Sequence, residues 1–345
     1  MNDSALLLLA ERQRLCDGPQ LLLADENLCS APLQLLQREN LTIVSNRYDL
    51  YERAVAEGFL CQFSDFELDQ FHSGSFSQVL FRVAKEKPLT HYLINQTRRL
   101  LADNGALALV GEKNDGIKTY AEKAGRYLGD RQRAEKHGNQ YLAVLHKLEP
   151  VGEPLPDQDY PKLRPCIEIG DTRLLSKPGQ FGWNKVDQGS ALLAEHLAAF
   201  LGETNPRSIL DLGCGYGYLS AMASRHCTAT ITATDNNAAA LLSCKANFSS
   251  LGIDGSVIAG DCGNTIAEKF DSVICNPPFH QGFGTDSDLT DRFVASCRQH
   301  LRTSGRALFV VNRFVPLEQV SAKQAVHAEL VAENRSFKVL SLALR

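Results

Sequence analysis

Four polar residues stand where short apolar segments of the sequence end. Asp211, Asp235 and Asp261 close or follow three of these segments, and Asn276 follows a fourth. In an open parallel sheet the carboxyl ends of the strands meet at one edge, where ligands bind. One such carboxylate is usually only a helix cap. Four consecutive strand ends carrying Asp or Asn indicate a binding site for a polar ligand.

The first of these residues, Asp211, opens a glycine-rich turn between a strand and a helix. The turn contains Gly213, Cys214, Gly215 and Gly217. Glycines let the backbone turn tightly and leave free N–H groups at the start of the helix. A dinucleotide fingerprint needs G-x-G-x-x-G, but its third glycine would fall on Tyr218 or Ser220. The observed D-x-G-x-G-x-G resembles the signature of S-adenosylmethionine (SAM) methyltransferases, and a purely structural glycine turn is the alternative.

The next two strand ends carry groups suited to a nucleoside. Asp235 lies about 20 residues beyond the turn, where an acidic residue binds the ribose hydroxyls, and Asn236 follows it. Asp261 and Cys262 follow the third strand. Asp261 is placed to accept a hydrogen bond from an adenine amino group. We therefore predict that these four residues belong to the cofactor site.

The fourth strand end, "NPPF", predicts the chemistry. The Asn276 side-chain carbonyl and the Pro277 main-chain carbonyl could both accept from one amino group, while Pro277 and Pro278 prevent helix and ladder pairing. An aromatic amine is a poor nucleophile, and two such bonds favour its pyramidal, more reactive form. Phe279 could stack on the base, which is typically worth roughly 1–3 kcal/mol. A chance proline turn is the alternative reading.

The elements that must position these residues alternate between strands and helices, which predicts an α/β fold with parallel βαβ units. The expected strands are 208–212, 230–234, 255–259, 271–275 and 307–311, and the expected helices are 219–225, 238–251 and 289–301. We expect a hairpin around Gly170 and two closing strands around Asn334.

Five prolines between residues 147 and 165 predict an extended linker. We therefore expect a domain at 1–148, a linker at 149–163 and a second domain at 164–345. The first half looks like a degenerate copy of the second. The segment from Phe76 aligns with that from Phe270, and the segment from Leu101 with that from Leu301. In this alignment Arg82-Val83-Ala84 replaces Asn-Pro-Pro.

The motifs "DLGCGYG", "TD" and "NPPF" place the second half among the class I amino-methyltransferases. Across the whole chain, "VGEKNDGIKTYAEKAG", "KPGQFGWNKVDQGSALL", "NPPFHQG" and "FKVLSLAL" resemble the ribosomal RNA small subunit methyltransferase C family. This resemblance implies two tandem Rossmann-like class I methyltransferase domains from a duplication, the N-terminal one degenerate and recognising RNA. It also implies SAM-dependent methylation of the N2 amine of a guanine in 16S rRNA, on the 30S subunit or its late precursor.

The resemblance assigns further roles in the second domain. Phe181 and the turn containing Asp187, Gly189 and Ser190 would close over SAM, and Asn276 would lie beside the donor methyl group. Trp183 is the only tryptophan and could stack on RNA, although a lone tryptophan is more often part of a core or lid.

Four rival functions remain open. The large-subunit (23S) guanine-N2 methyltransferases share "NPPFHQ" and the duplicated architecture, whereas glutamine-N5 methyltransferases resemble only the second half. A SAM-binding or ribosome-binding module without turnover is a rival of another class. An NAD oxidoreductase is disfavoured by the glycine spacing.

Composition limits the partners. The net charge of −4 indicates no overall affinity for polyanions, so any RNA surface must be local. We predict RNA contact along the densest basic run; a solvated helix face is the alternative. The run comprises Lys113, Lys118, Lys123, Arg126, Arg131, Arg133 and Lys136.

The ten cysteines include no C-x-x-C pair, which argues against disulfides and zinc, so we expect reduced thiols and no metal. No apolar run approaches the roughly 20 residues of a membrane span, and the N-terminus lacks a secretory signal. We expect a cytoplasmic monomer.

Overall fold

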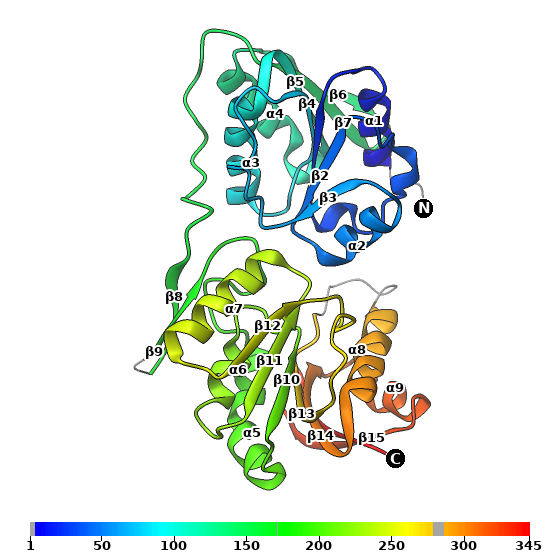
Figure 1. Cartoon of the computed structure of the whole chain (residues 1–345), viewed down its shortest axis with the longest axis vertical. Helices are drawn as coiled ribbons and strands as arrows, with labels where there is room; N and C mark the ends of the chain where they lie inside the picture. The colour runs from blue at the N-terminus through cyan, green and yellow to red at the C-terminus, as the bar shows by residue number, and fades with distance from the viewer. Residues whose placement is uncertain (1–3, 171, 279–285) are drawn as a thin grey trace. The chain divides into compact units, whose positions relative to one another are not determined.

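The computed structural model describes residues 4–170, 172–278 and 286–345, and Phe279 therefore lies outside the described residues. The chain divides into two compact units, Met1–Lys162 and Leu163–Arg345, referred to below as the N-terminal and C-terminal units. Each contains one seven-stranded sheet covered by helices on both faces (Figure 1).

The C-terminal unit begins with a two-stranded hairpin, β8 (Arg164–Ile169) and β9 (Thr172–Ser176), as expected around Gly170. Its sheet has the order β12-β11-β10-β13-β14-β16-β15. The strands are β10 (Ser208–Leu212), β11 (Thr230–Asp235), β12 (Gly255–Ala259), β13 (Phe270–Cys275), β14 (Leu301–Asn312), β15 (Val326–Glu333) and β16 (Phe337–Leu344). The helices are α5 (Gln188–Thr204), α6 (Tyr218–Ala223), α7 (Ala238–Leu251), α8 (Asp286–His300) and α9 (Leu317–Lys323). Helices α5, α6 and α7 cover one face, and α8 and α9 the other (Figure 1).

The N-terminal unit has the same strand order, β3-β2-β1-β4-β5-β7-β6. Its strands are β1 (Gln20–Ala24), β2 (Leu41–Ser45), β3 (Leu60–Phe63), β4 (Phe76–Arg82), β5 (Leu101–Glu112), β6 (Glu135–His137) and β7 (Gln140–His146). Its helices are α1 (Ser4–Gln13), α2 (Tyr48–Ala56), α3 (Lys87–Leu100) and α4 (Ile117–Leu128), with 3₁₀ turns η1 (Glu26–Leu28), η2 (Leu33–Leu35) and η3 (Lys113–Asp115).

The residue pairing of the two sheets confirms the internal duplication. Phe76 pairs with Leu101, and after a register shift Gln78 pairs with Ala106. In the C-terminal unit Phe270 pairs with Leu301, and after the same shift Ser272 pairs with Arg306. The two halves therefore share their strand order and this register shift, in the alignment that the sequence predicted.

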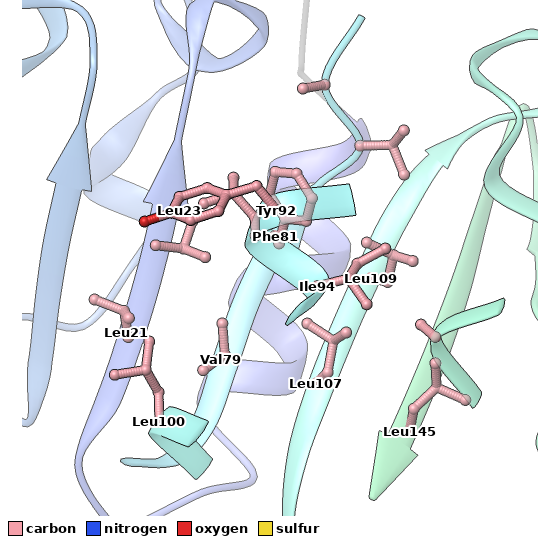
Figure 2. Close-up of a cluster of buried hydrophobic side chains, with 14 of the residues drawn as sticks. Leu21, Leu23, Val79, Phe81, Tyr92, Ile94, Leu100, Leu107, Leu109 and Leu145 are labelled. Atoms are coloured by element: carbon pink, nitrogen blue, oxygen red, sulfur yellow. The ribbon is translucent and has the colours of Figure 1, made fainter. Parts of the chain in front are cut away.

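Apolar strands fix this register because each sheet is buried on both faces. In the N-terminal unit one face carries Leu21, Leu23, Val79, Phe81 and Leu107, which pack against α3 and α4 in the cluster of Figure 2. Slipping a strand by one residue would exchange its two faces, so packing specifies the register.

Most expected elements form, with small differences in their bounds. Helix α6 begins and ends one or two residues earlier than expected, and β14 begins at Leu301, where the sequence predicted the last helical residue. Helices α5 and α9 were not predicted. The described part of residues 148–163 contains no helix or strand. None of the described helices is long and apolar enough to cross a membrane.

Candidate active site at the carboxyl edge of the C-terminal sheet

The glycine turn follows β10 and is shaped by positive backbone angles. Gly213 has φ of +79° and Gly217 has φ of +86°, and a Cβ atom at residue 217 would lie 2.9 Å from the Cys244 sulfur. The N–H groups of Gly213 and Cys214 both donate to the Thr234 carbonyl at 2.9 Å. A side chain at residue 217 would therefore meet both strain and a clash, which explains this glycine.

Asp211 lies inside the protein directly beneath this turn. Its Oδ2 accepts from the Ser220 N–H at 3.0 Å and from the Ser220 hydroxyl at 2.6 Å. Its Oδ1 is buried and has no hydrogen-bond partner among the described residues. Burial raises the pKa of Asp211 to about 7, against the opposing effect of the Ser220 bonds. A buried acceptor without a partner is costly, so this oxygen is suited to receive a donor from a ligand.

Asp235 connects the glycine turn to the next loop. Its two oxygens accept from the N–H groups of Gly215 and Asn237, each at 2.9 Å. The carboxylate is half-buried, and each of its oxygens has further acceptor capacity. The neighbouring Asn236 is also half-buried, at the same strand end. The predicted ribose site is therefore a preorganised carboxylate beside the glycine turn.

Asp261 and Cys262 follow β12 at the same edge of the sheet. The Asp261 carboxylate forms an ion pair with Arg292 of α8, and its N–H donates to the Asn264 side chain at 2.9 Å. Cys262 has a φ of +49°. The sequence analysis did not predict that Arg292 would lie at this candidate site, because nothing in the spacing of α8 distinguishes it from a surface arginine.

Asn276 follows β13 and is held by the first turn of α5. Its Nδ2 donates to Asp187 Oδ2 and to Ser190 Oγ, both at 2.8 Å. Asp187 is also the N-cap of α5, because the same oxygen accepts from the Ser190 N–H at 2.9 Å. A carboxylate can only accept, so the NH₂ end of the Asn276 amide must face Asp187. Oδ1 is therefore the end left to face a substrate.

The two prolines after Asn276 differ in exposure, Pro277 being buried and Pro278 exposed. The segment before α5, residues 177–187, lies at the same edge. Asn237 Nδ2 donates to the Gly179 carbonyl at 2.9 Å, and the buried Gln180 donates to Ser243 at 2.5 Å. Phe181, expected to close over SAM, is 76% exposed.

Three other residues of this region have structural positions that bear on their predicted roles. Trp183 is half-buried, and Gly189 is buried, where a Cβ atom would lie 3.2 Å from the Phe337 ring. Asn247 was not predicted. It is fully buried, exchanges two bonds with the Leu175 backbone and donates to the Tyr216 carbonyl at 2.8 Å, so it connects β9 to the glycine turn.

The predicted basic run lies in the N-terminal unit, on η3, α4, β6 and the residues between them. Six of the seven side chains are exposed and Lys123 is half-buried. Lys118 lies over the Tyr141 ring with its Nζ 4.6 Å from the ring centre, and Arg126 pairs with Glu122. Lys123, Arg126 and Arg131 line a cavity of about 560 Å³ together with residues 150–156.

Comparisons with known proteins agree with this architecture. Residues 171–341 match the Methyltransferase small domain family, and residues 7–136 match the Methyltransferase small domain N-terminal family. A ribosomal RNA small subunit methyltransferase C from Shewanella loihica is 31% identical over 270 residues, covering 77% of this chain and 76% of that protein. The chain belongs to the ribosomal RNA small subunit methyltransferase C family.

A second relative supports the family, and a solved structure supports the fold. The Erwinia tasmaniensis protein of that name is 31% identical over 261 residues, covering 74% of this chain and 72% of that protein. A solved structure, the T. thermophilus 16S rRNA N2 G1207 methyltransferase in complex with AdoMet and guanosine, has a TM-score of 0.81 at 23% identity, covering 99% and 92% of the two chains. The family and the fold predicted from the sequence are confirmed.

We expect the unfolding free energy of the C-terminal unit without cofactor to fall as pH rises from about 4 to about 7. The folded pKa of Asp211, about 7, lies above the ordinary value of 3.8 for an aspartate. The folded state therefore keeps a proton that the unfolded state has lost, and raising the pH removes that stabilisation. Trp183, the only tryptophan, reports this unit in fluorescence-detected urea unfolding.

The Asp211→Asn variant should reduce this pH dependence. Asp25→Asn is the matched control because Asp25, whose pKa is also raised to about 7 by burial, lies in the other unit. It should leave the Trp183 transition unchanged. If the unfolding free energy of Asp211→Asn fell with pH as steeply as that of the wild type, Asp211 would not be the source of the pH dependence.

We expect Asp187→Ala to lower kcat for methyl transfer by roughly 10–100-fold, because the Asn276 amide loses its charged acceptor and can rotate. SAM affinity, measured by calorimetry, should change much less. Asp187→Asn keeps an acceptor for both bonds and should recover most of the rate. Wild-type kcat in Asp187→Ala would show that Asp187 does not position the amide.

Proposed function

We propose that this protein transfers a methyl group from SAM to the exocyclic N2 amine of a guanine in 16S rRNA, acting on the 30S subunit or its late precursor. The arrangement of Asn276 is the observation that carries the proposal. Its Nδ2 is occupied by Asp187 and Ser190, which orients the amide with its oxygen available as an acceptor.

The residues at the sheet edge are suited to hold SAM. The amino group of the cofactor would find an acceptor in the buried Asp211 Oδ1. Asp235 offers acceptors to ribose hydroxyls, and Asp261 offers one to the adenine amino group. When bound, SAM supplies the electrophilic methyl group. Chemistry of this kind needs no metal, and among the described residues no group of three or more His, Cys, Asp or Glu side chains could hold one.

The protein residues act mainly by orienting the amine. Asn276 Oδ1 and the Pro277 carbonyl would each accept a hydrogen bond from one N–H group of the amine. They would thereby hold the nitrogen lone pair toward the methyl group. Water must be excluded from this position, and the burial of Pro277 contributes to that. The target base must leave its stack to reach the edge, at a cost of a few kcal/mol unless the particle already exposes it.

The relatives favour the small subunit over the large-subunit alternative. The Shewanella and Erwinia proteins carry the small-subunit name, and the T. thermophilus enzyme is described as modifying G1207. We propose that this chain modifies the equivalent guanine. We also propose that it acts as a cytoplasmic monomer.

The decisive assay combines purified protein and labelled SAM with 30S particles, 50S particles or naked 16S rRNA, followed by digestion to nucleosides. We expect label in N2-methylguanosine from the 30S reaction. The Asn276→Ala variant should bind SAM with an affinity near that of the wild type and lose at least about 100-fold in kcat, because two orienting bonds are reduced to one. Label only in 50S particles would favour the large-subunit alternative, and SAM binding without transfer would favour a non-catalytic module.

We further propose that the N-terminal unit contacts rRNA phosphates through the basic run. The cavity lined by Lys123, Arg126 and Arg131 supports this, because three cationic residues border one concave surface. Such contacts position the substrate without reading its sequence. In the C-terminal unit, Phe181 and Phe314 are 76% and 88% exposed. Phe181 lies in residues 177–187, and Phe314 follows β14, which runs parallel to β13 toward the same edge. These rings are suited to stack on unpaired bases near the target.

Replacing Lys123, Arg126 and Arg131 by Glu should raise the KM for 30S particles at least about 10-fold. The slope of log KM against log salt concentration should fall by about one for each phosphate contact that is lost. Affinity for SAM should not change. The matched control reverses Arg14, Arg38 and Lys85, three exposed cations of the same unit outside the run. Equal effects of the two triple variants would indicate only a general charge effect.

A further inference from the structure

The strand pairing gives each active-site residue a counterpart in the N-terminal unit. Gln20 pairs with Gln78 and Leu41, as Ile209 pairs with Ser272 and Ile231. Counting along the strands from these pairs assigns the counterparts. Leu22 corresponds to Asp211, Ser45 to Asp235, Asp65 to Asp261 and Arg82 to Asn276. Of the three carboxylates, only that at residue 261 has an acidic counterpart.

The backbone confirms that Asp65 and Asp261 are equivalent. The Ser64 N–H donates to the Ser45 carbonyl at 3.0 Å, as the Gly260 N–H donates to the Asp235 carbonyl at 3.1 Å. The residues that follow the two acids both have left-handed backbone angles, +56° at Phe66 and +49° at Cys262. The two loops therefore share this hydrogen bond and a left-handed residue directly after the acid.

In the N-terminal unit the position beside the Asp65 carboxylate is filled by a side chain from the proline-rich segment. The Tyr160 hydroxyl donates to Asp65 Oδ1 at 2.7 Å, and Tyr160 is fully buried. Its ring stacks on Tyr92 of α3 with a centroid distance of 5.3 Å and an interplanar angle of 25°. Tyr92 in turn donates to the Phe66 carbonyl at 3.2 Å. Figure 2 shows Tyr92 within the main apolar cluster of this unit.

The chain before Tyr160 is bound along α3 by its backbone. Asn95 accepts from the Leu155 N–H and donates to the Leu155 carbonyl, both at 2.8 Å. His91 Nδ1 donates to the Pro156 carbonyl at 2.8 Å. Burial and the neighbouring Asp65 carboxylate raise the pKa of Tyr160 well above its usual value, so the phenol keeps the proton that it donates.

We propose that the N-terminal unit keeps an aromatic binding site at the position of the cofactor's base, and that Tyr160 occupies this site as an internal ligand. The comparison with the cofactor's base rests on the function proposed above. The Tyr160 hydroxyl donates one hydrogen bond to the buried Asp65 carboxylate. The amino group of adenine is expected to donate in the same way to the equivalent Asp261. The phenol ring of Tyr160 occupies the site, so the N-terminal unit binds no second SAM molecule.

The test is chemical rescue in the full-length protein. Tyr160→Ala should lower the unfolding midpoint of the N-terminal unit by roughly 5–15 °C, because it removes a buried aromatic side chain. Added 4-methylphenol, which reproduces the lost ring and hydroxyl, should restore at least half of that shift in a saturable manner, whereas toluene should restore less. Calorimetry, with hydrogen exchange of peptides from β4 and α3, measures both effects. Tyr141→Ala is the matched control, because it removes the same type of ring from a half-buried position beside Lys118.

An equal response of both alanine variants to 4-methylphenol, or no response of a folded Tyr160→Ala protein, would overturn the proposal. If Tyr160→Ala does not fold, a double-mutant cycle of Tyr160→Phe and Asp65→Asn tests the proposal. The two variants should lower the unfolding free energy by less in combination than the sum of their separate effects, and full additivity would refute the contact. Wild-type protein should bind one SAM per chain in equilibrium dialysis, and two would overturn the filled site. Asp235→Ala separates the two proposals, because it should weaken SAM binding and leave the phenol response of Tyr160→Ala intact.

Discussion

The parallel pairing of β10 with β11 and β13 is the constraint on which the site depends. Leu212 pairs with Thr234 on one side and Cys275 on the other, so Asp235, Asn276 and the glycine turn all emerge at one edge of the sheet. Fully buried residues such as Ile209 and Ile274 fix this register. A slip of one residue would turn their side chains to the opposite face, and the edge would lose its alignment.

The N-terminal unit shows that this framework does not need the polar strand ends. It keeps the strand order, the register shift and both apolar faces, while Leu22 and Ser45 replace the carboxylates of Asp211 and Asp235. Leu22 is fully buried and packs in the core between the sheet and α1 and α2. The buried Asp211 carboxyl, by contrast, has its pKa raised by desolvation, so its charged form costs stability. The polar strand ends of the C-terminal unit are therefore not needed for the fold, which agrees with the binding role proposed for them.

Sequence reasoning predicted the parts of the candidate site that depend on local order. The glycine turn, the acids at the strand ends and Asn276 all follow from short patterns, and the pairing of the sheets places them together. Contacts between distant residues could not be predicted in this way. Asp187 and Asn276 are 89 residues apart, and Asp65 and Tyr160 are 95 apart. The partner of a buried amide or phenol depends on tertiary packing, which no periodicity records, and for that reason Asn247 was missed as well.

A single loop connects the two halves of the candidate site. Residues 177–187 are bound to the end of β11 by Asn237 and Gly179, and they lead directly into Asp187, which holds the Asn276 amide at the end of β13. The edge suited to the cofactor and the oxygen suited to the substrate amine are therefore linked through one short stretch of backbone. A shift of this loop would alter the Asn276 orientation and the neighbourhood of Asp235 together, because the two ends of the loop are fixed to adjacent parts of the same edge.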